Sequence, residues 1–344
     1  MSRPAMRVSF CYPGLEETRP WLQGLDEALG EVCTTLWQPG DPLADYGVVW
    51  SPPQQFFDEQ SGLKAVFSMG AGIDGLMHLR LPEDLPIVRL EDAGMGVQMA
   101  EYVCHAVIRH FREFDAYEAD MRQGQWSFRK PRERADFPVG IMGLGVLGAR
   151  VARSLVQFEF PVNGWSRSPK VPGDWVTERS APCPPPALRA PPLPTQNARS
   201  PSLLEGVKCF SGADGFQDFL AASRVLVCLL PLTPDTRDIM SRNSLSRLQA
   251  GGYVINVARG AHLVDEDLLD LLSSGHLAGA TLDVFRTEPL PQGHPFWAHP
   301  QITVTPHTSA RTLRSESIAQ IAGKIAALQR GEPLAGVVER ERGY

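Results

Sequence analysis

Three side chains that together can hold a carboxylate and move a proton lie in the second half of the chain. Arg259, Glu288 and His307 each come just after a short apolar run of the kind that forms a buried strand. A guanidinium can grip a carboxylate with two parallel hydrogen bonds, and an imidazole exchanges protons near neutral pH. A lone histidine after a strand is commonly structural. Here, however, an arginine, a glutamate and a histidine follow successive predicted strands. This pattern predicts one catalytic site at the carboxyl edge of a sheet.

A glycine-rich turn lies upstream of these residues, in segment 139–148. It follows an apolar run and opens an amphipathic helix, which is the context that a dinucleotide-binding fingerprint requires. Gly143 permits a tight turn, Gly145 lets the backbone approach a pyrophosphate, and Gly148 lets the helix pack closely on the strand. The helix N-terminus offers N–H groups to the phosphates. The expected cofactor-binding residues here are Gly143, Gly145, Val146, Leu147 and Gly148.

The end of the next predicted strand bears on the type of dinucleotide. A protein that binds NAD(H) usually has Asp or Glu there to hold the ribose hydroxyls. This chain has Ser166, Arg167 and Ser168 instead. An arginine can bind a 2′-phosphate, which a carboxylate would repel, and the serines can donate hydrogen bonds to it. The residues therefore favour NADP(H), with NAD(H) as the alternative cofactor.

Composition excludes several classes of protein. The chain has 344 residues, of which 43% are hydrophobic and 21% charged, and its formal net charge is −6. This length predicts about two domains, and the acidic balance disfavours a nucleic-acid partner. We find no apolar run long enough for a membrane span and no signal peptide. The six cysteines are scattered, which predicts reduced thiols in a cytoplasmic protein and no metal site.

Alternation of short apolar runs with helical patterns predicts an α/β fold with parallel sheets. Strands are expected at 6–11, 47–50, 64–69, 87–90, 137–142, 161–165, 207–210, 225–230, 253–257, 280–284 and 302–304. Helices are expected at 19–29, 96–121, 147–158, 215–222, 243–248, 265–273 and 313–329. The stretch 181–201 departs from this pattern, with eight prolines in 21 residues. We expect a poorly ordered insertion at about 169–202, the alternative being a proline-rich ligand for a partner.

Several motifs together resemble one known family. They occupy segments 68–74, 89–96, 98–102, 139–148, 229–233, 256–260, 283–289 and 341–344. On these motifs the chain resembles the D-isomer-specific 2-hydroxyacid dehydrogenase family over nearly its whole length. Within that family it is most similar to the glyoxylate/hydroxypyruvate reductase A group.

The resemblance implies a role for each candidate side chain in the substrate site. Arg259 would clamp the substrate carboxylate, and His307 would act as the general acid that protonates the carbonyl oxygen. Glu288 would pair with His307 and fix its tautomer. The loop Gly70, Ala71 and Gly72 would offer backbone N–H groups to the carboxylate, and Trp50 would wall the pocket.

The resemblance also implies further contacts with the cofactor. Asp283 would bind the nicotinamide carboxamide, although a role as a strand-end cap is an equal alternative. Leu230 and Pro231 would line the cofactor, with Thr236 as an additional candidate.

The implied architecture has two Rossmann-like α/β domains with parallel sheets. Residues 1–100 and 308–344 would form a discontinuous substrate domain, and residues 101–307 would form the NAD(P)-binding domain. The implied activity is NADPH-dependent reduction of small 2-oxo acids, glyoxylate and hydroxypyruvate foremost, by a homodimer that uses helix 96–121 in its contact. The alternatives are an NAD-dependent dehydrogenase of a bulkier 2-hydroxy acid and a nonenzymatic NAD(P)-sensing module.

Overall fold

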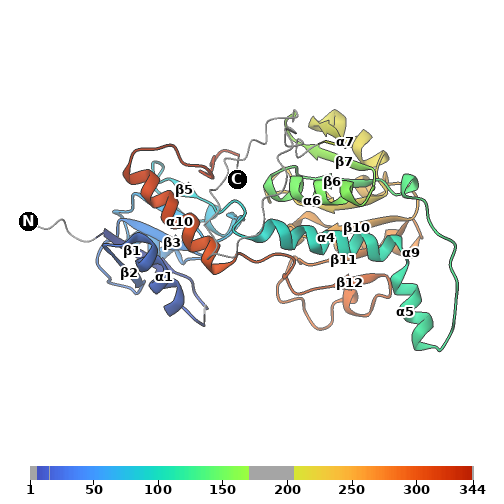
Figure 1. The fold of residues 1–344 in the computed structure, drawn as a ribbon, viewed down its shortest axis with the longest axis horizontal. Coiled ribbons are helices and arrows are strands. Elements are labelled where there is room, and N and C mark those ends of the chain that lie inside the picture. The colour runs from blue at the N-terminus through green and yellow to red at the C-terminus, as the bar shows by residue number, and fades with distance from the viewer. Residues whose placement is uncertain (1–5, 15, 170–204, 343–344) are drawn as a thin grey trace, which may run out of the picture.

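The computed structural model describes residues 6–14, 16–169 and 205–342, which form two α/β lobes (Figure 1). The insertion expected at about 169–202 lies outside these residues, apart from Pro169. Each lobe is built on one parallel sheet, and the predicted fold class is confirmed. In the described part of the chain, no helix combines the length and apolar character that a bilayer span requires.

The first lobe has a five-stranded sheet in the order β2-β1-β3-β4-β5. Its strands are β1 (Met6–Cys11), β2 (Val32–Leu36), β3 (Tyr46–Val49), β4 (Ala65–Ser68) and β5 (Ile87–Val88). Helices α1 (Arg19–Leu29) and α10 (Arg314–Gln329) share an apolar cluster with one face of the sheet, and α2 (Gln54–Glu59) and α3 (Asp74–Met77) share another with the opposite face. The C-terminal helix α10 has therefore returned to the first lobe, as Figure 1 shows.

The second lobe has a seven-stranded sheet in the order β12-β11-β10-β9-β6-β7-β8. Its strands are β6 (Val139–Met142), β7 (Val162–Ser166), β8 (Val207–Ser211), β9 (Val225–Cys228), β10 (Gly252–Asn256), β11 (Leu277–Leu282) and β12 (Ile302–Val304). Its helices are α4 (Met95–Phe111), α5 (Phe114–Arg122), α6 (Val146–Gln157), α7 (Gly212–Ala221), α8 (Arg242–Leu245) and α9 (Asp265–Ser273). Short 3₁₀ turns lie at Arg134–Asp136, Gly260–His262 and Pro295–Ala298.

The central strands of this sheet are apolar on both faces because helices cover both. Val225 and Val227 of β9 join the cluster under α4 and α6, while Leu226 and Cys228 join the cluster under α7, α8 and α9. This is why the strands read as continuous apolar runs rather than alternating ones.

The structure differs from the prediction in several elements, and helices α2 and α3 are among those that the sequence analysis did not include. The expected single helix at 96–121 is wrong, because Glu113 adopts a left-handed backbone (φ 55°) that ends α4 and starts α5. Strand β2 was not predicted. It lies at the edge of its sheet and pairs only with β1, and its residues Cys33 to Leu36 carry too little apolar alternation to stand out.

The two segments that connect the lobes contact each other. Leu313 N–H donates to Ala93 O at 2.9 Å. The Gln98 amide donates to Arg311 O and to Gly94 O, each at 2.8 Å, and accepts from Arg311 N–H at 3.3 Å. The start of α4 and the approach to α10 are thus joined side by side where the chain passes between the lobes.

Strand order reverses once in each sheet, between β1 and β3 and between β6 and β9. Ligands bind beyond the carboxyl ends of strands at such points. Tyr12 and Trp50 follow β1 and β3, and Gly143 and Leu229 follow β6 and β9; all four line one cavity. The fold therefore places both reversal points around the same space.

Candidate active site between the lobes

Two adjoining cavities lie between the lobes, with volumes of about 830 and 310 Å³. The larger one extends from the glycine-rich turn at Gly143 to the first lobe. The smaller one lies beside it, around Ser51 and Glu288. The residues that line both are Trp50, Gly72, Ile73, Asp74, Leu232, Arg259 and His307. Arg259 and His307 therefore lie at the junction of the two cavities.

The predicted pairing of His307 with Glu288 is present in the structure. His307 Nδ1 lies 2.7 Å from Glu288 Oε2, and Glu288 Oε1 accepts from Phe285 N–H at 2.9 Å. The carboxylate is thus held by one backbone donor and presents its other oxygen to the imidazole. With Nδ1–H donating to Glu288, the remaining ring nitrogen, Nε2, is left to exchange a proton with a ligand.

Asp283 fixes the loop that carries His307. Its carboxylate accepts from the Thr305 hydroxyl at 2.6 Å and from Thr308 N–H and Ser309 N–H at 2.8 Å each. His307 N–H donates to Asp283 O at 2.8 Å, and His307 has a left-handed backbone, with φ 50°. Such a conformation costs free energy in a non-glycine residue and persists where its surroundings determine it.

Asp283 is fully buried and lies outside the lining of both cavities. The structure thus shows a loop anchor at this position, and the predicted contact of Asp283 with a nicotinamide carboxamide stays a prediction. Tyr102 of α4 extends the anchor, since its hydroxyl lies 2.5 Å from Thr305 Oγ1, which donates to Asp283. Burial raises the pKa of Tyr102 to about 12, so the phenol stays protonated.

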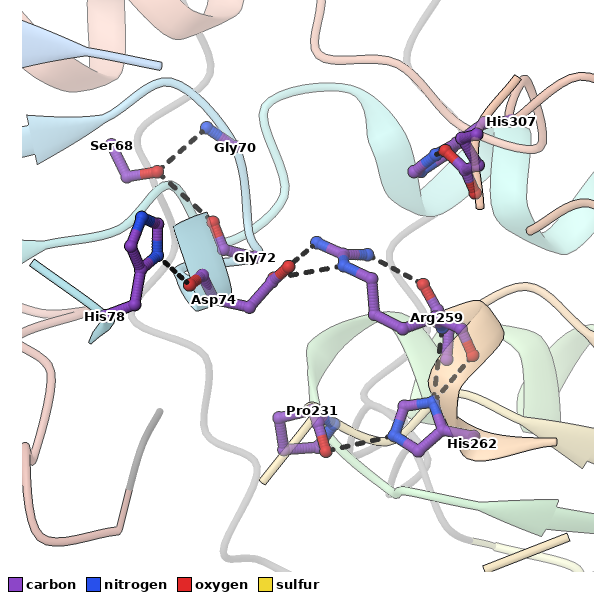
Figure 2. A network of polar contacts seen from close by, with 11 residues as sticks. Ser68, Gly70, Gly72, Asp74, His78, Pro231, Arg259, His262 and His307 are labelled. Atoms are coloured by element: carbon purple, nitrogen blue, oxygen red, sulfur yellow. Dashed lines mark hydrogen bonds and ion pairs between the residues drawn. The ribbon is translucent and has the colours of Figure 1, made fainter. Parts of the chain in front are cut away.

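Arg259 reaches from the second lobe to the first. Its Nε donates to Asp74 Oδ1 at 3.0 Å, its Nη2 lies 3.0 Å from the same oxygen, and its Nη1 donates to Ala258 O at 2.7 Å. Figure 2 shows Arg259 linked through its side chain to Asp74 and through its backbone to His262. The guanidinium is therefore held from both lobes.

His262 supports the turn that carries Arg259. It is fully buried, and burial holds its pKa below the usual range, so the ring is neutral. Its Nε2 lies 3.3 Å from Pro231 O, and its Nδ1 accepts from Arg259 N–H at 3.2 Å. This neutral histidine ties the turn after β10 to the segment after β9. The sequence gives no sign of this role, because a His three residues after an Arg forms no recognisable pattern.

The predicted carboxylate-binding loop, Gly70 to Gly72, lines the larger cavity. Ser68 shapes it, accepting from Gly70 N–H at 3.5 Å and donating to Gly72 O at 3.3 Å. A Cβ at Gly70 would lie 2.4 Å from the Trp50 ring. Trp50 thus packs directly on this loop and walls both cavities, and the assignment of the loop's N–H groups to a substrate stays a prediction.

The glycine-rich turn has the geometry that the sequence predicts. Gly143 has φ 99°, and a Cβ at Gly148 would lie 1.9 Å from Gly143 O, so helix α6 packs closely against the turn. An added Cβ at Gly145 would meet no atom within 4 Å. Gly145 therefore leaves open space at the N-terminus of α6, where it lines the larger cavity, and its predicted contact with a pyrophosphate stays a prediction. Val146 and Leu147 line that cavity as well.

Ser166, Arg167 and Ser168, at the end of β7, line the larger cavity as well. Ser166 Oγ donates to Ser168 O at 2.8 Å, which turns the chain sharply at the end of β7. Arg167 Nη2 lies 3.8 Å from an exposed Asp235 carboxylate. The strand end thus presents a guanidinium to the rim, as a 2′-phosphate site requires.

Leu230, Pro231 and Thr236 line the larger cavity, and the segment they begin lies against the glycine-rich turn at Gly143. The Thr236 hydroxyl donates to Pro231 O at 2.7 Å and accepts from Thr233 N–H at 2.8 Å. Thr236 therefore closes a tight turn after β9, and its side chain is already engaged with the backbone.

Comparison with known proteins assigns the chain to a class. Residues 104–181 and 199–309 match the sequence model of the D-isomer specific 2-hydroxyacid dehydrogenase, NAD binding domain. The chain is 41% identical to a protein of Serratia proteamaculans named glyoxylate/hydroxypyruvate reductase A, over 98% of this chain and 100% of that protein. The chain belongs to the D-isomer specific 2-hydroxyacid dehydrogenase family, and the predicted family is confirmed.

Solved structures agree with this assignment. A D-isomer specific 2-hydroxyacid dehydrogenase from Xanthobacter autotrophicus, in complex with NADPH and MES, superposes with a TM-score of 0.85 at 36% identity, covering 99% of this chain and 100% of that one. An NADPH-dependent glyoxylate/hydroxypyruvate reductase from Sinorhizobium meliloti, in complex with NADP and sulfate, gives a TM-score of 0.81 at 33% identity, covering 98% and 100%.

Proposed function

We propose that this chain is an NADPH-dependent reductase of small 2-oxo acids, with glyoxylate and hydroxypyruvate as its preferred substrates. The observation that carries the proposal is the meeting of Arg259, the Glu288–His307 pair and the glycine-rich turn around one interlobe space. The names of the relatives from Serratia and Sinorhizobium support the same substrates.

Arg259 and the Gly70–Gly72 loop would orient the substrate. The guanidinium holds the carboxylate through charge-assisted hydrogen bonds, and the loop approaches closely because it carries no bulky side chains. The ring of Trp50 limits the space beyond the loop. This enclosure favours a short acid over one with a large side chain.

His307 would supply the proton. Its Nε2–H donates to the carbonyl oxygen as negative charge develops there, and Glu288 stabilises the doubly protonated ring through Nδ1. A positioned proton donor of this kind contributes ~10²–10⁴-fold to the rate. In the reverse direction the neutral ring accepts the proton from the hydroxyl group.

The residues of the larger cavity fit NADP(H). Gly143, Gly145 and Gly148 leave room at the N-terminus of α6 for the pyrophosphate, and Arg167 would bind the 2′-phosphate. The bound dinucleotide supplies the hydride. The NADPH and NADP complexes of the Xanthobacter and Sinorhizobium proteins support this cofactor.

Absorbance of NADPH, followed with a panel of short and bulky 2-oxo acids, tests the proposal. We expect turnover with glyoxylate and hydroxypyruvate, a lower kcat/KM with phenylpyruvate, and at least a ~10²-fold loss of kcat in H307A. Absence of turnover with every short 2-oxo acid would reject the function. A higher kcat/KM with NADH than with NADPH would reject the cofactor, and a preference for phenylpyruvate would favour a dehydrogenase of bulkier acids.

We propose further that the domains divide near residues 100 and 308.

We also propose that two copies associate through α4 and α5. Exposed apolar side chains gather on and after α5, where Met121, Trp126 and Phe128 are 70%, 102% and 90% exposed. A second copy of this chain would cover them. Light scattering tests the dimer, which the double variant W126S/F128S should weaken. A cytoplasmic location stays a prediction.

A further inference from the structure

Asp74 is an acid in the site to which the sequence analysis gave no role. It opens α3 in the first lobe, just after the Gly70–Gly72 loop, and meets Arg259 of the second lobe, 185 residues away. We propose that Asp74 is a positioning residue that presents Arg259 to the substrate carboxylate. The inference rests on the proposed role of Arg259.

The hydrogen bonds of the guanidinium support this role. A guanidinium carries five N–H donors, one on Nε and two on each terminal nitrogen. Asp74 Oδ1 accepts from Nε–H and lies 3.0 Å from Nη2, and Ala258 O accepts from one hydrogen of Nη1. One hydrogen then remains on each terminal nitrogen. A carboxylate can accept from two such hydrogens at once.

Gly72 makes the contact sterically feasible. A Cβ at position 72 would lie 1.8 Å from Arg259 Nη2 and 3.1 Å from Asp74 Oδ1. Any side chain there would therefore displace the guanidinium. The loop that is predicted to bind the carboxylate through its backbone thus also leaves space for the arginine.

Asp74 remains charged in this arrangement. Burial favours its neutral form, but the charge and hydrogen bond of Arg259 outweigh burial and hold the pKa of Asp74 below its usual range. The carboxylate also lines both cavities, so without Arg259 it would repel an anionic substrate. Asp74 therefore favours anion binding only through Arg259. Its removal should weaken anion binding when Arg259 is present and should not weaken it when Arg259 is absent.

A purely structural role for Asp74 predicts a different effect of its removal on ligand binding. Asp74 lies in the first turn of α3, where an acid stabilises the N-terminus of a helix. If that were its whole contribution, its removal would weaken ligand binding with or without Arg259. The two roles are separated by measuring the effect of D74A in both backgrounds.

The experiment measures binding of oxalate, a planar carboxylate probe, in the presence of NADP+. Quenching of tryptophan fluorescence reports it, since Trp50 lines both cavities. The variants are D74A, D74N, R259A and D74A/R259A. The matched control is D58N, because Asp58 forms an exposed pair with Arg80 in the same lobe, at 3.9 Å, and lies outside both cavities. Glyoxylate turnover, NADPH affinity and the thermal unfolding midpoint are measured alongside.

We expect D74A to weaken oxalate binding by about tenfold or more. D74N, whose amide oxygen still accepts from Nε–H, should lose less, and D58N should match the wild type. In the R259A background, D74A should leave the affinity for oxalate unchanged or tighten it. NADPH affinity should stay near its wild-type value in D74A.

Two results would overturn the inference: wild-type oxalate affinity in D74A, or an equal loss from D74A in both backgrounds. Wild-type protein that binds oxalate but reduces no 2-oxo acid would reject the proposed function alone. The Asp74 inference would then be decided by the binding data.

Discussion

Replacement of Glu288 by Gln would test whether the carboxylate beside His307 favours the proton-donating form of the ring. In the structure one oxygen of Glu288 accepts from Phe285 N–H at 2.9 Å and the other lies 2.7 Å from His307 Nδ1. A Gln that keeps the bond to Phe285 must turn its NH₂ group toward Nδ1. The ring can then hold only the tautomer with Nδ1 unprotonated, and the doubly protonated form loses its partner.

The size of the effect follows from the bond that is lost. A hydrogen bond to a charged group contributes about 1.5–3 kcal/mol. The side chains of His307 and Glu288 are 44% and 36% exposed, so solvent screening places the loss near the lower end, at about 1.5–2 kcal/mol. At about 1.4 kcal/mol per tenfold, kcat for reduction falls by about 10- to 30-fold in E288Q.

The assay is the initial rate of glyoxylate reduction with saturating NADPH. The control is E332Q, since Glu332 pairs with Arg330 at 2.7 Å just beyond α10 and lies outside both cavities. A kcat within about threefold of the wild type would contradict the assigned role of Glu288.

Other predictions concern the cofactor and stability. R167A should lower kcat/KM with NADPH by about 10- to 100-fold and leave that with NADH unchanged, as steady-state kinetics will show. G148A, whose Cβ would lie 1.9 Å from Gly143 O, should lower stability by about 1–3 kcal/mol in denaturant titrations, whereas G145A should weaken NADPH binding at unchanged stability. Burial lowers the pKa of His110 from 6.5 to about 3, so the folded state stays neutral there while the unfolded state takes up a proton below pH 6.5. The contribution of the neutral His110 ring to the free energy of unfolding should therefore be present above pH 6.5 and fall by about 1.6 kcal/mol between pH 6.5 and 5, and H110F should remove that part of the loss.

Features that depend on local sequence were predictable. The glycine-rich turn was predictable because its two structural requirements fall within a few residues. The backbone at Gly143 is left-handed, and the close packing at Gly148 leaves no room for a side chain. Strands β1 and β12 and helices α1 and α9 have the predicted bounds, since each has a clear apolar pattern between turn residues. The meeting of Glu288 with His307 followed from the rule that parallel strands end at one edge.

Contacts that depend on the tertiary arrangement were not predictable in this way. Asp74 and Arg259 come from different lobes, and no periodicity relates them. Asp283 is an acid at a strand end, and only the structure shows that its carboxylate accepts from the backbone of its own neighbouring loop. The break between α4 and α5 depends on the left-handed backbone of Glu113, a residue type that gives no warning of a helix end.

The anchoring of the His307 loop by Asp283 has a consequence for sequence variation. Asp283 accepts from the main-chain N–H groups of Thr308 and Ser309, and its own carbonyl accepts from that of His307. Every residue except proline provides such a donor. The side chains at 308 and 309 can therefore diverge between relatives while the imidazole keeps its place, whereas substitution of the deeply buried aspartate would release the whole loop at once.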